Sequence, residues 1–364
     1  MLFVLSLHLS FYLGVRTMNL FNKSKKLLVS SLCILALGVA GCNNGASNSG
    51  GDTANKAAAN YPSGNLDLVA PAGAGGGWDT TIRMLAKTLG DTGIVKAPMP
   101  VRNAPGAGGA VHLATLQAAN KKADPNTITV YSPPILFFNL NGSSEYGYRN
   151  TTPLARLIAD YAAFVVRADS PYKDINELME ALKKNPKAVK IGGTSAVGSM
   201  DHVQFLIIAK AAGVENIDKI DYVPFDDDGV AQLLGGHIDL FSTGLSDVKG
   251  LVESGDVRVL AQTADKRIGE GKMGEIPTAM ESGINATFIN WRGLFGTPEM
   301  PEYAVNFWRD ALKKLQDTPE WKQVCEEKGW DNIYLDAPEF KEFLEKTEKE
   351  YIEVMQQIGM LKKQ

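Results

Sequence analysis

The chain has 364 residues, of which 37 are basic and 41 acidic, and its formal net charge is −4. It has no basic cluster and no interleaving of aromatic with basic residues, which argues against nucleic acid as a partner. Two of its three cysteines lie in the first 42 residues, so Cys325 is left without a second cysteine for an internal disulfide.

An export signal is predicted for residues 1–41. A basic patch at residues 23–26 precedes the apolar run LLVSSLCILALGVA, and small residues stand directly before Cys42. The sequence VAGC is similar to the lipobox of bacterial lipoproteins, in which the cysteine is diacylated and becomes the mature N terminus. The alternative is a short membrane anchor, but the run is shorter than the roughly 20 apolar residues that a span needs. Met18 opens a conventional signal by itself, so residues 1–17 are a candidate upstream extension.

Residues 42–64 are predicted to be a flexible tether. The stretch after Cys42, NNGASNSGGDTANKAAANYPSGN, has almost no side chain to bury. Acyl chains on Cys42 would hold a folded domain at the outer face of the cytoplasmic membrane without crossing it. Four basic residues and no acidic residue precede Cys42, so the exported chain has 33 basic and 41 acidic residues, a net charge of −8.

From residue 65 onward the sequence repeats one unit, in which an apolar strand is followed by a turn rich in glycine or hydroxyl residues and then by a helix. LDLVAP leads into AGAGGGWD and then into Ile82, Leu85 and Leu89 at helical spacing. VRNAPGAGGAVHLA repeats the pattern with Val111 on the helix face, and KIGGTSAVGSMDHV repeats it with Ser199 as a cap. This order predicts an α/β fold with mostly parallel sheets, followed by charged amphipathic helices at the C terminus.

The glycine turns expose backbone N–H groups that can bind an anion. Backbone N–H groups at the start of a helix carry a partial positive charge, and glycine lets an anion approach the main chain closely. A dinucleotide fingerprint would need glycine where Trp78 and Val111 stand, and no phosphate-loop motif is present. The turns are therefore interpreted as anion cradles that do not bind nucleotides. In the alternative interpretation, the glycines only allow tight turns from strand to helix.

The sequence gives little support for a catalytic site or a metal site. The exported chain's histidines, His112, His202 and His237, are never paired at the spacing of a zinc site. Ser195 in GTSAVG lacks the second glycine of a nucleophile elbow. The run at residues 226–228 lacks the further oxygen ligands of a calcium loop, so a helix cap is the favoured interpretation. The sequence therefore predicts a binding protein without catalytic residues, metal or cofactor.

Seven stretches, in one order, resemble the substrate-binding receptors of tripartite tricarboxylate transporters, also called Bug receptors. They are PAGAGGGWDTTIRMLAKTL, VRNAPGAGGAVHLA, KIGGTSAVGSMDHV, YVPFDDDGVAQLLGGHIDL, VRVLAQTADKR, IPTAMESGI and NWRGLFGTPEMPE. The resemblance covers nearly all of residues 65–364. It implies a monomer with a two-lobed type II periplasmic-binding-protein fold, with residues 65–160 and 282–364 in one lobe and residues 161–281 in the other.

The resemblance also implies a function. The receptor would close on a small organic carboxylate, such as citrate or another di- or tricarboxylate, and deliver it to a membrane permease with one large and one small subunit. The ligand cleft would lie between the lobes at the carboxyl ends of the strands, as is general for open α/β sheets. Two alternatives from other classes are a cell-surface α/β hydrolase or transferase and a binding co-receptor for a sensor kinase.

Site residues are carried over from the family by position. The first loop would offer backbone amides to one ligand carboxylate, with Asp79 capping the following helix. The second loop would hold bridging waters, with Ser132 near the cleft. The third loop would hold the second carboxylate, with His202 either touching the ligand or packing in the protein. The loop residues concerned are Ala74, Gly75, Gly76 and Gly77 in the first, Pro105, Gly106 and Gly108 in the second, and Thr194, Ser195, Gly198 and Ser199 in the third.

Two positions depart from the family pattern. Asp226 and its neighbours put negative charge near the mouth of the expected cleft, where many relatives have a Tyr-Lys-Gly-like turn. Arg292 stands where relatives often have an uncharged residue. It would either pair with a ligand carboxylate or form a salt bridge within its own lobe. Trp78 and Trp291 would either wall the pocket or pack in the core.

Overall fold

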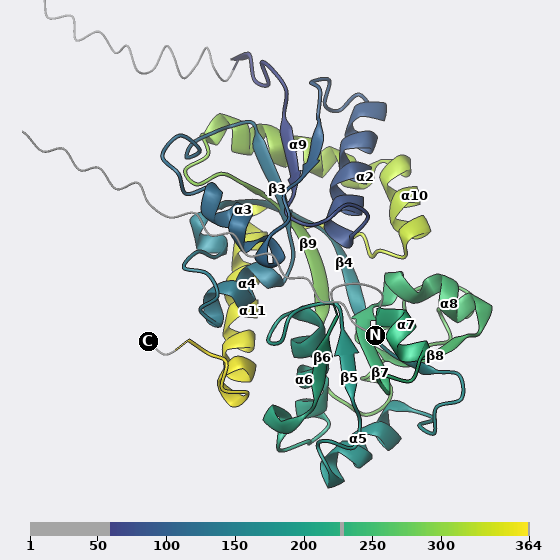
Figure 1. Cartoon of the computed structure of the whole chain (residues 1–364). Helices are drawn as coiled ribbons and strands as arrows, with labels where there is room; N and C mark the ends of the chain where they lie inside the picture. The colour runs from purple at the N-terminus through teal and green to yellow at the C-terminus, as the bar shows by residue number, and fades with distance from the viewer. Residues whose placement is uncertain (1–58, 226–228, 363–364) are drawn as a thin grey trace, which may run out of the picture. The chain divides into compact units, whose positions relative to one another are not determined.

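The computed structural model describes residues 59–225 and 229–362 (Figure 1). The predicted export signal, Cys42, most of the predicted tether and Asp226 lie outside these ranges. The described residues belong to one compact unit. Two long antiparallel strands, β4 (Thr152–Arg167) and β9 (Ile289–Gly296), run side by side through its middle.

The first sheet has the strand order β2, β1, β3, β9, β4. β1 (Asp67–Ala70) pairs in parallel with β2 (Val101–Asn103) and β3 (Thr127–Tyr131). β9 lies between β3 and β4 and is antiparallel to both. β1 and β3 are almost completely buried, as expected of parallel strands that are covered on both faces.

The second sheet is formed by the C-terminal part of β4 with β7 (Leu240–Gly244), β5 (Ile191–Gly193), β6 (Tyr222–Pro224) and β8 (Val257–Gln262). β5 is parallel to β6 and β7, whereas β4 is antiparallel to β7 and β8. The α/β class is confirmed, but the prediction of mostly parallel sheets was wrong. The antiparallel pairs come from β4 and β9, which lie outside the repeat of strand, turn and helix.

The strand directions bring the turns of the two sheets toward each other. β1, β2 and β3 run in the same direction as β4, because β9 is antiparallel to both β3 and β4. β5, β6 and β7 run the opposite way, because β7 is antiparallel to β4 and parallel to β5. Since β4 starts in the first sheet and ends in the second, the carboxyl ends of β1, β2 and β3 point toward the second sheet. Those of β5, β6 and β7 point toward the first.

Helices follow most of these strands. α2 (Gly77–Asp91) buries Ile82, Leu85 and Leu89, as their spacing predicts. α3 (Ala110–Thr115) buries His112 and leaves Val111 exposed, so Val111 does not lie on the core face. The other helices and 3-10 turns of this part are α4 (Pro134–Leu140), α5 (Ile175–Lys184), α6 (Met200–Ala211), α7 (Gly229–Leu234), α8 (Lys249–Ser254), η1 (Ala107–Gly109), η2 (Tyr148–Asn150), η3 (Ile217–Lys219) and η4 (Leu245–Val248).

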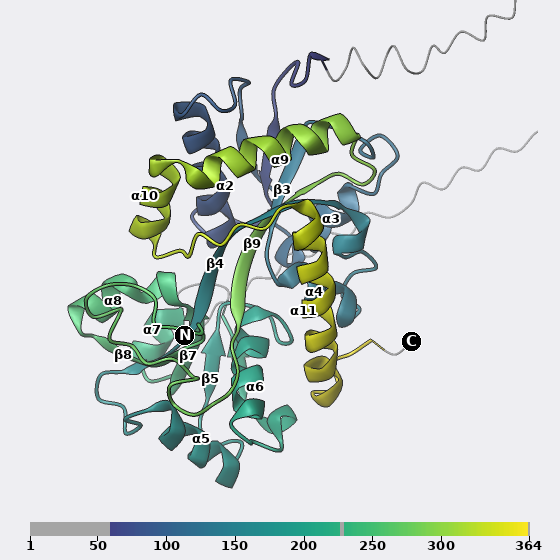
Figure 2. The ribbon, with the colours of Figure 1, turned by 180° about the vertical axis from the view of Figure 1, so that it is seen from behind.

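The C-terminal part forms three helices with charged outer faces, as predicted: α9 (Glu302–Asp317), α10 (Pro319–Lys328) and α11 (Ala337–Gln357). Thr318 caps α10 and Asp336 caps α11, and each helix has a proline in its first turn. α11 packs against β4, α4 and α6, so it contacts elements of both sheets (Figure 2). Within the described ranges, no helix is long and apolar enough to cross a membrane.

Candidate ligand-binding site

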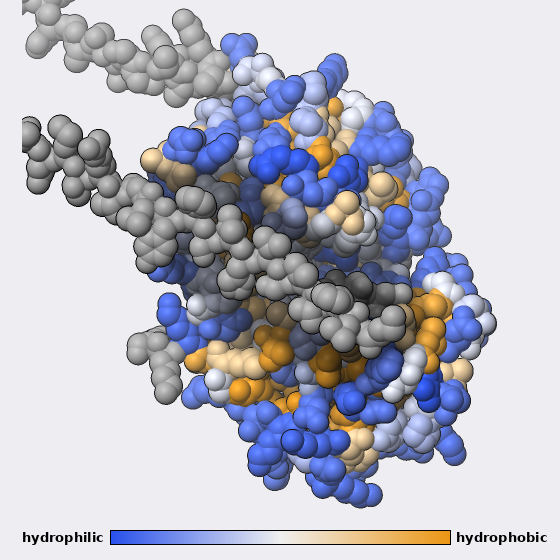
Figure 3. All heavy atoms as spheres, in the orientation of Figure 1, coloured by the Kyte–Doolittle hydropathy of each residue, from blue (hydrophilic) through white to orange (hydrophobic). Residues whose placement is uncertain are grey.

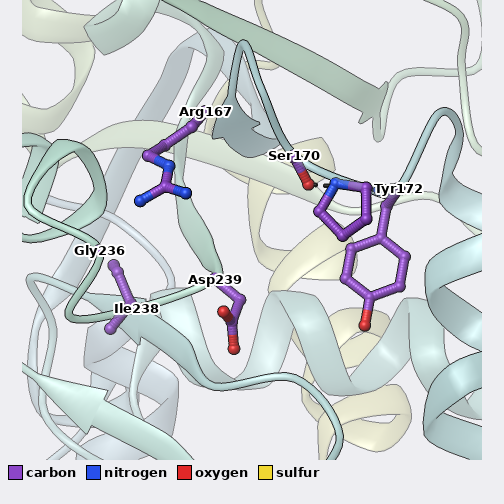
Figure 4. Close-up of a pocket in the computed structure, with 7 residues that line it drawn as sticks. Arg167, Ser170, Tyr172, Gly236, Ile238 and Asp239 are labelled. Carbon is purple, nitrogen blue, oxygen red and sulfur yellow. Dashed lines mark hydrogen bonds between the residues drawn. The ribbon is translucent and has the colours of Figure 1, made fainter.

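Two cavities of the described unit are lined by residues outside the predicted loops. The cavity in Figure 4 has a volume of about 170 Å³ and is lined by Arg167, Tyr172 and Asp239, near the end of β4. A cavity of about 510 Å³ lies between η4, α8 and the end of α10, with Lys249 and Trp330 in its lining. The predicted site is built instead from exposed backbone at the carboxyl ends of strands.

The first loop, between β1 and α2, exposes Ala74, Gly75, Gly76 and Gly77 to solvent. α2 begins at Gly77 with Gly76 in the N-cap position, and no side chain caps it. The prediction that Asp79 caps this helix was wrong, because Asp79 is the third residue of α2. The backbone N–H groups of Gly76 and Gly77 donate to no residue of the described part of the chain. They are therefore open to an anion at the helix start.

Asp79 binds the first loop back onto its helix. Its carboxylate accepts hydrogen bonds from Gly75 N at 2.9 Å, from Arg83 Nε at 2.8 Å and from Asn103 Nδ2 at 2.9 Å. The hydrogen bond from Arg83, one helical turn later, is the main cause that lowers the pKa of Asp79 to about 2. The Gly75 amide is therefore occupied by a carboxylate of the protein itself.

The second loop, between β2 and α3, has a left-handed backbone. Gly106, Gly108 and Gly109 have φ values of 150°, 62° and 103°, which favour glycine. Pro105 and Gly108 are exposed, and Gly109 N donates to Gly106 O. The loop therefore presents mainly backbone to its surroundings.

Trp78 connects the turns that follow β1, β2 and β3. Its ring lies 2.9 Å from the position that a Cβ on Gly109 would take, and 5.6 Å from the Tyr131 ring between centroids, edge to face. Its Nε1 donates to Ser132 Oγ at 2.9 Å, and Ser132 is buried. The three turns therefore meet, with Trp78 packed among them and the Ser132 hydroxyl engaged by the indole. Trp291 is fully buried in the core.

Arg292 lies directly behind the first loop. Its Nη2 is 2.6 Å from the position that a Cβ on Gly77 would take, and its Nη1 donates to Thr81 Oγ1 at 3.0 Å. Only 4% of Arg292 is exposed, and Nη2 lies 3.6 Å from Oδ2 of Asp160. Of the two alternatives, the structure shows the internal salt bridge. The guanidinium also places a positive charge next to the start of α2.

Asp160 lies where β4 passes from the first sheet to the second. Asp160 pairs with β9, whereas Ala162, two residues later, pairs with β7. Besides facing Arg292, the Asp160 carboxylate accepts hydrogen bonds from the N and Oγ of Ser246 in η4. Burial raises the pKa of Asp160 above its ordinary value, against the opposing effect of Arg292. This ion pair links the start of α2 to the second sheet.

The third loop, between β5 and α6, is folded around Asp201. The Oδ2 atom accepts hydrogen bonds from Thr194 N at 2.8 Å, from Ser195 N at 3.0 Å and from Thr194 Oγ1 at 3.2 Å. Ser195 Oγ in turn accepts from Asp201 N at 2.7 Å. Burial raises the pKa of Asp201 to about 6, although these hydrogen bonds oppose the rise. The donors of Thr194 and the Ser195 amide are therefore used inside the loop.

The rest of the third loop is more open. Ala196 and Val197 are exposed, and their N–H groups donate to no residue in the described ranges. Ser199 occupies the N-cap position of α6, as predicted, but its side chain makes no capping hydrogen bond. These groups lie at the N terminus of α6, where the helix dipole favours an anion.

His202 packs inside the protein. Its ring stacks on Tyr222 with 4.5 Å between centroids, and its Nδ1 accepts from Gly198 N at 3.0 Å. Burial lowers the pKa of His202 to about 4, so the ring is neutral near pH 7. Gly198 has a φ of 76°, and a Cβ there would lie 2.6 Å from the sulfur of Met360. Of the two predicted roles for His202, the structure shows packing.

Reactive groups near the loops are engaged elsewhere. Ser195 Oγ is bonded to Asp201 N and His202 Nδ1 to Gly198 N, so these two side chains do not form a nucleophile and base pair. Cys325 is free and buried, and burial raises its pKa to about 12. In the part of the chain that the structure describes, no group of three His, Cys, Asp or Glu side chains is placed to hold a metal.

Three residues of the site were not found from the sequence. Asp201 has a local signal, because it stands two residues after an N-cap position that follows a glycine-rich turn, much as Asp79 stands three residues after Gly76. Asp160 and Asn103 have no such signal, because their roles depend on which strands pair.

Two α/β sheets that share the long strand β4, and whose parallel strands point their carboxyl ends at each other, define a protein of the periplasmic-binding-protein type. A comparison with family profiles then identifies the family. Residues 82–360 match the profile described as tripartite tricarboxylate transporter family receptor. The chain belongs to this family, and the resemblance of the seven sequence stretches is confirmed.

Solved structures agree with this assignment. A TctC solute-binding protein from Polaromonas, without ligand, is 26% identical with a TM-score of 0.65, and the match covers 81% of this chain and 99% of that one. Rpa4515 from R. palustris, with adipate, has a TM-score of 0.71 at 21% identity and coverage of 82% and 98%. MatC from Rhodopseudomonas palustris, with bound malate, has a TM-score of 0.66 at 20% identity and coverage of 81% and 99%. The predicted fold is thereby confirmed.

Proposed function

We propose that the protein is an extracytoplasmic receptor that captures a small di- or tricarboxylate and delivers it to the large and small membrane subunits of a tripartite tricarboxylate-type transporter. One observation carries the proposal. Exposed turns of the two sheets point toward each other, and each set ends at a helix start whose N–H groups have no acceptor among the described residues. The adipate and malate in two structural neighbours support a carboxylate as the ligand.

One ligand carboxylate would bind at the N terminus of α2. The amides of Gly76 and Gly77 donate to it there, and the partial charge of the helix favours it. Gly76 has a φ of −72°, and only Gly73 O, at 3.7 Å, lies near the position of its absent Cβ. Neither the backbone conformation nor packing demands glycine at this position. Its contribution is the access that it gives a ligand to the amides.

The other carboxylate would bind at the N terminus of α6. The N–H groups of Ala196 and Val197 and the hydroxyl of Ser199 supply the donors. This contact lies further along the third loop than the sequence suggests, because Asp201 occupies the amides of Thr194 and Ser195. Each end of the ligand then meets a helix start of a different sheet.

Ligand contacts on both sheets would favour a closed receptor. We place residues 65–160 and 282–364 in one lobe and residues 161–281 in the other, so β4 crosses the boundary next to Asp160. The pairing of β4 shifts register near Pro153, Arg156 and Phe164, and such irregularities are points where a strand bends. A ligand that holds both lobes shifts the population toward the closed form, which the permease would recognise. No chemical step is involved.

The receptor would work as a monomer close to the membrane. The diacylated Cys42 and the tether that follows it would hold the domain at the outer face of the cytoplasmic membrane, near the permease. This arrangement raises the local concentration of loaded receptor at the transporter without a membrane-spanning segment.

The test is carboxylate binding by the full chain with an altered first loop. Gly76→Leu is compatible with the local φ and with the space around Gly76, but its side chain covers the neighbouring amides. In calorimetry against a panel of di- and tricarboxylates, the wild type should bind at least one of them, and Gly76→Leu should bind it at least about tenfold more weakly, a loss of about 1.4 kcal/mol. Gly73→Leu is the matched control, since Gly73 is exposed in the same loop with no atom within 4 Å.

The outcomes separate two errors. A wild type that binds no member of the panel would contradict the receptor function. A Gly76→Leu variant that binds like Gly73→Leu would remove the first loop from the site and leave the receptor function standing.

A further inference from the structure

The C-terminal segment, residues 358–362, follows α11 in a fixed conformation. Gly359 has a φ of 68°, and its N–H donates to Gln356 O at 3.2 Å. The N–H of the next residue, Met360, donates to Met355 O at 2.9 Å. These two hydrogen bonds form the Schellman motif, which ends a helix with a glycine in the left-handed conformation. The end of the helix therefore determines where Met360 lies.

The Met360 side chain packs against Gly198 of the third loop. Gly198 has a φ of 76°, and the Met360 sulfur lies 2.6 Å from the position that a Cβ on Gly198 would take. The three atoms nearest to that position all belong to Met360. Gly198 N in addition donates to His202 Nδ1 at 3.0 Å. Gly198 is therefore held by a hydrogen bond to His202 and by packing against Met360.

The C-terminal segment is also attached to α4, in the proposed lobe of residues 65–160 and 282–364. Lys362 N donates to Leu140 O at 2.7 Å, and Lys362 side-chain carbons lie 3.2 Å from the position that a Cβ on Gly142 would take. The end of α11 lies beside α6 in Figures 1 and 2, and hydrophobic residues gather over the region of β5, β6 and α6 in Figure 3. The segment therefore carries a contact from one proposed lobe to the third loop of the other.

The two amides proposed for the second carboxylate lie between two fixed points of the third loop. Ala196 and Val197 follow Ser195, whose O accepts from Tyr222 OH at 2.7 Å, and precede Gly198. Glycine has more backbone freedom than any other residue, so Gly198 keeps its conformation only where contacts hold it. Amides bind an anion most tightly when they are already held in the right arrangement. The packing against Gly198 therefore affects the geometry of both amides.

We infer that Met360 is a positioning residue for ligand binding. It holds Gly198, and through Gly198 the amides of Ala196 and Val197, in the arrangement that binds a carboxylate. The inference rests on the proposed function, because it requires a ligand carboxylate at the start of α6. It gives the C-terminal segment, which is distant in sequence from all three loops, a part in setting the affinity for the ligand.

The experiment compares Met360→Ala with Leu361→Ala in the full chain. Both variants shorten a half-buried side chain that packs against the same hydrophobic cluster, but Leu361 is not among the nearest neighbours of Gly198. Calorimetry uses whichever of succinate, malate, adipate and citrate the wild type binds most tightly. Met360→Ala should bind it at least about fivefold more weakly, and Leu361→Ala within about twofold of the wild type. Met360→Leu keeps a similar volume and should also bind within about twofold.

Amide hydrogen exchange measures the third loop directly. The Gly198 N–H should exchange at least about tenfold faster in Met360→Ala than in Leu361→Ala, because only the first variant releases the glycine. Thermal unfolding confirms that each variant is folded.

The outcomes again separate two errors. The inference is overturned if Met360→Ala binds like the wild type, if Leu361→Ala loses as much affinity, or if Gly198 exchanges equally fast in both variants. A wild type that binds none of the four acids contradicts the proposed function, and the inference is then wrong with it.

Discussion

The first and third loops share one hydrogen-bonding arrangement, but the pKa of the aspartate shifts in opposite directions in the two. In both, an aspartate in the first turn of a helix reaches back and accepts hydrogen bonds from amides of the preceding loop, Asp79 from Gly75 and Asp201 from Thr194 and Ser195. The pKa of Asp79 is lowered to about 2, chiefly by its hydrogen bond from Arg83. The pKa of Asp201 is raised to about 6 by burial.

The difference follows from the neighbouring cation in one loop and from burial in the other. Four positions after Asp79 stands Arg83, and four positions after Asp201 stands Phe205, which is fully buried. A cation at this spacing favours the charged form of Asp79, whereas no cation stands there for Asp201 and burial disfavours its charged form. A shared backbone shape therefore does not imply a shared affinity for a ligand anion.

The largest expected effect comes from removing the buried cation behind the first loop. Arg292→Met leaves Asp160 buried without its cation, which should lower the free energy of unfolding by about 3–5 kcal/mol. The double variant Asp160→Asn, Arg292→Met removes both charges and should recover most of this loss. Urea unfolding followed by circular dichroism measures both variants. A single variant as stable as the wild type would contradict the structural role given to this pair.

A smaller effect is expected from removing the charge in the third loop. Because the folded-state pKa of Asp201, about 6, lies above its ordinary value, the folded chain binds more protons than the unfolded chain between about pH 4 and pH 6. The contribution of Asp201 to the free energy of unfolding therefore falls as the pH rises through this window. Asp201→Asn keeps an oxygen acceptor but cannot ionise, so its stability relative to the wild type should rise with pH, by at most about 1.4 kcal/mol per pH unit.

His202 does not disturb this measurement. The pKa of His202 is lowered by burial to about 4, so its own contribution to stability is lost as the pH falls below its ordinary pKa, the opposite direction to Asp201. Both proteins contain His202, and its contribution cancels when their unfolding free energies are subtracted. A difference that does not change between pH 4 and pH 6 would show that Asp201 titrates normally.

The smallest effect is expected at the cap of α6. Ser199→Ala should change the free energy of unfolding by less than about 0.5 kcal/mol, because the side chain makes no capping bond, whereas Asp336→Ala should cost about 1 kcal/mol. The same Ser199→Ala variant should weaken carboxylate binding if the hydroxyl is a ligand donor. Thermal unfolding and calorimetry on the two variants measure these effects. A Ser199→Ala loss as large as that of Asp336→Ala would show a cap that the structure lacks.

Local features of the fold were predictable from the sequence, and features that depend on strand pairing were not. The spacing of Ile82, Leu85 and Leu89 predicted the buried face of α2, and the glycine turns marked the loops at strand ends. Nothing local in β4 or β9 shows that the two strands pair antiparallel or that β4 joins the two sheets. The exposure of Val111 was also missed, because Ala110, His112 and Leu113 form the buried face of α3.

The candidate site was predicted in outline only. Glycine marks where backbone is accessible, and the sequence shows it at Gly75, Gly76 and Gly77. The sequence does not show which of those amides donates to another group of the protein. The Gly75 amide donates to Asp79 because of a bend that exists only in the folded loop. The two roles proposed for Arg292 were both chemically sound, and the choice between them was made by Asp160, which is distant in sequence and adjacent across β4 and β9.

The contacts of the last described residues indicate where a reporter group is best attached. After α11 the chain brings the Met360 sulfur within 2.6 Å of the position that a Cβ on Gly198 would take, and Lys362 N donates to Leu140 O at 2.7 Å. A fluorophore on a Lys362→Cys variant would therefore sit between the end of α4 and the third loop. Its emission would follow any ligand-dependent shift between them, whereas a bulky purification tag fused there would disturb the same spot and belongs elsewhere.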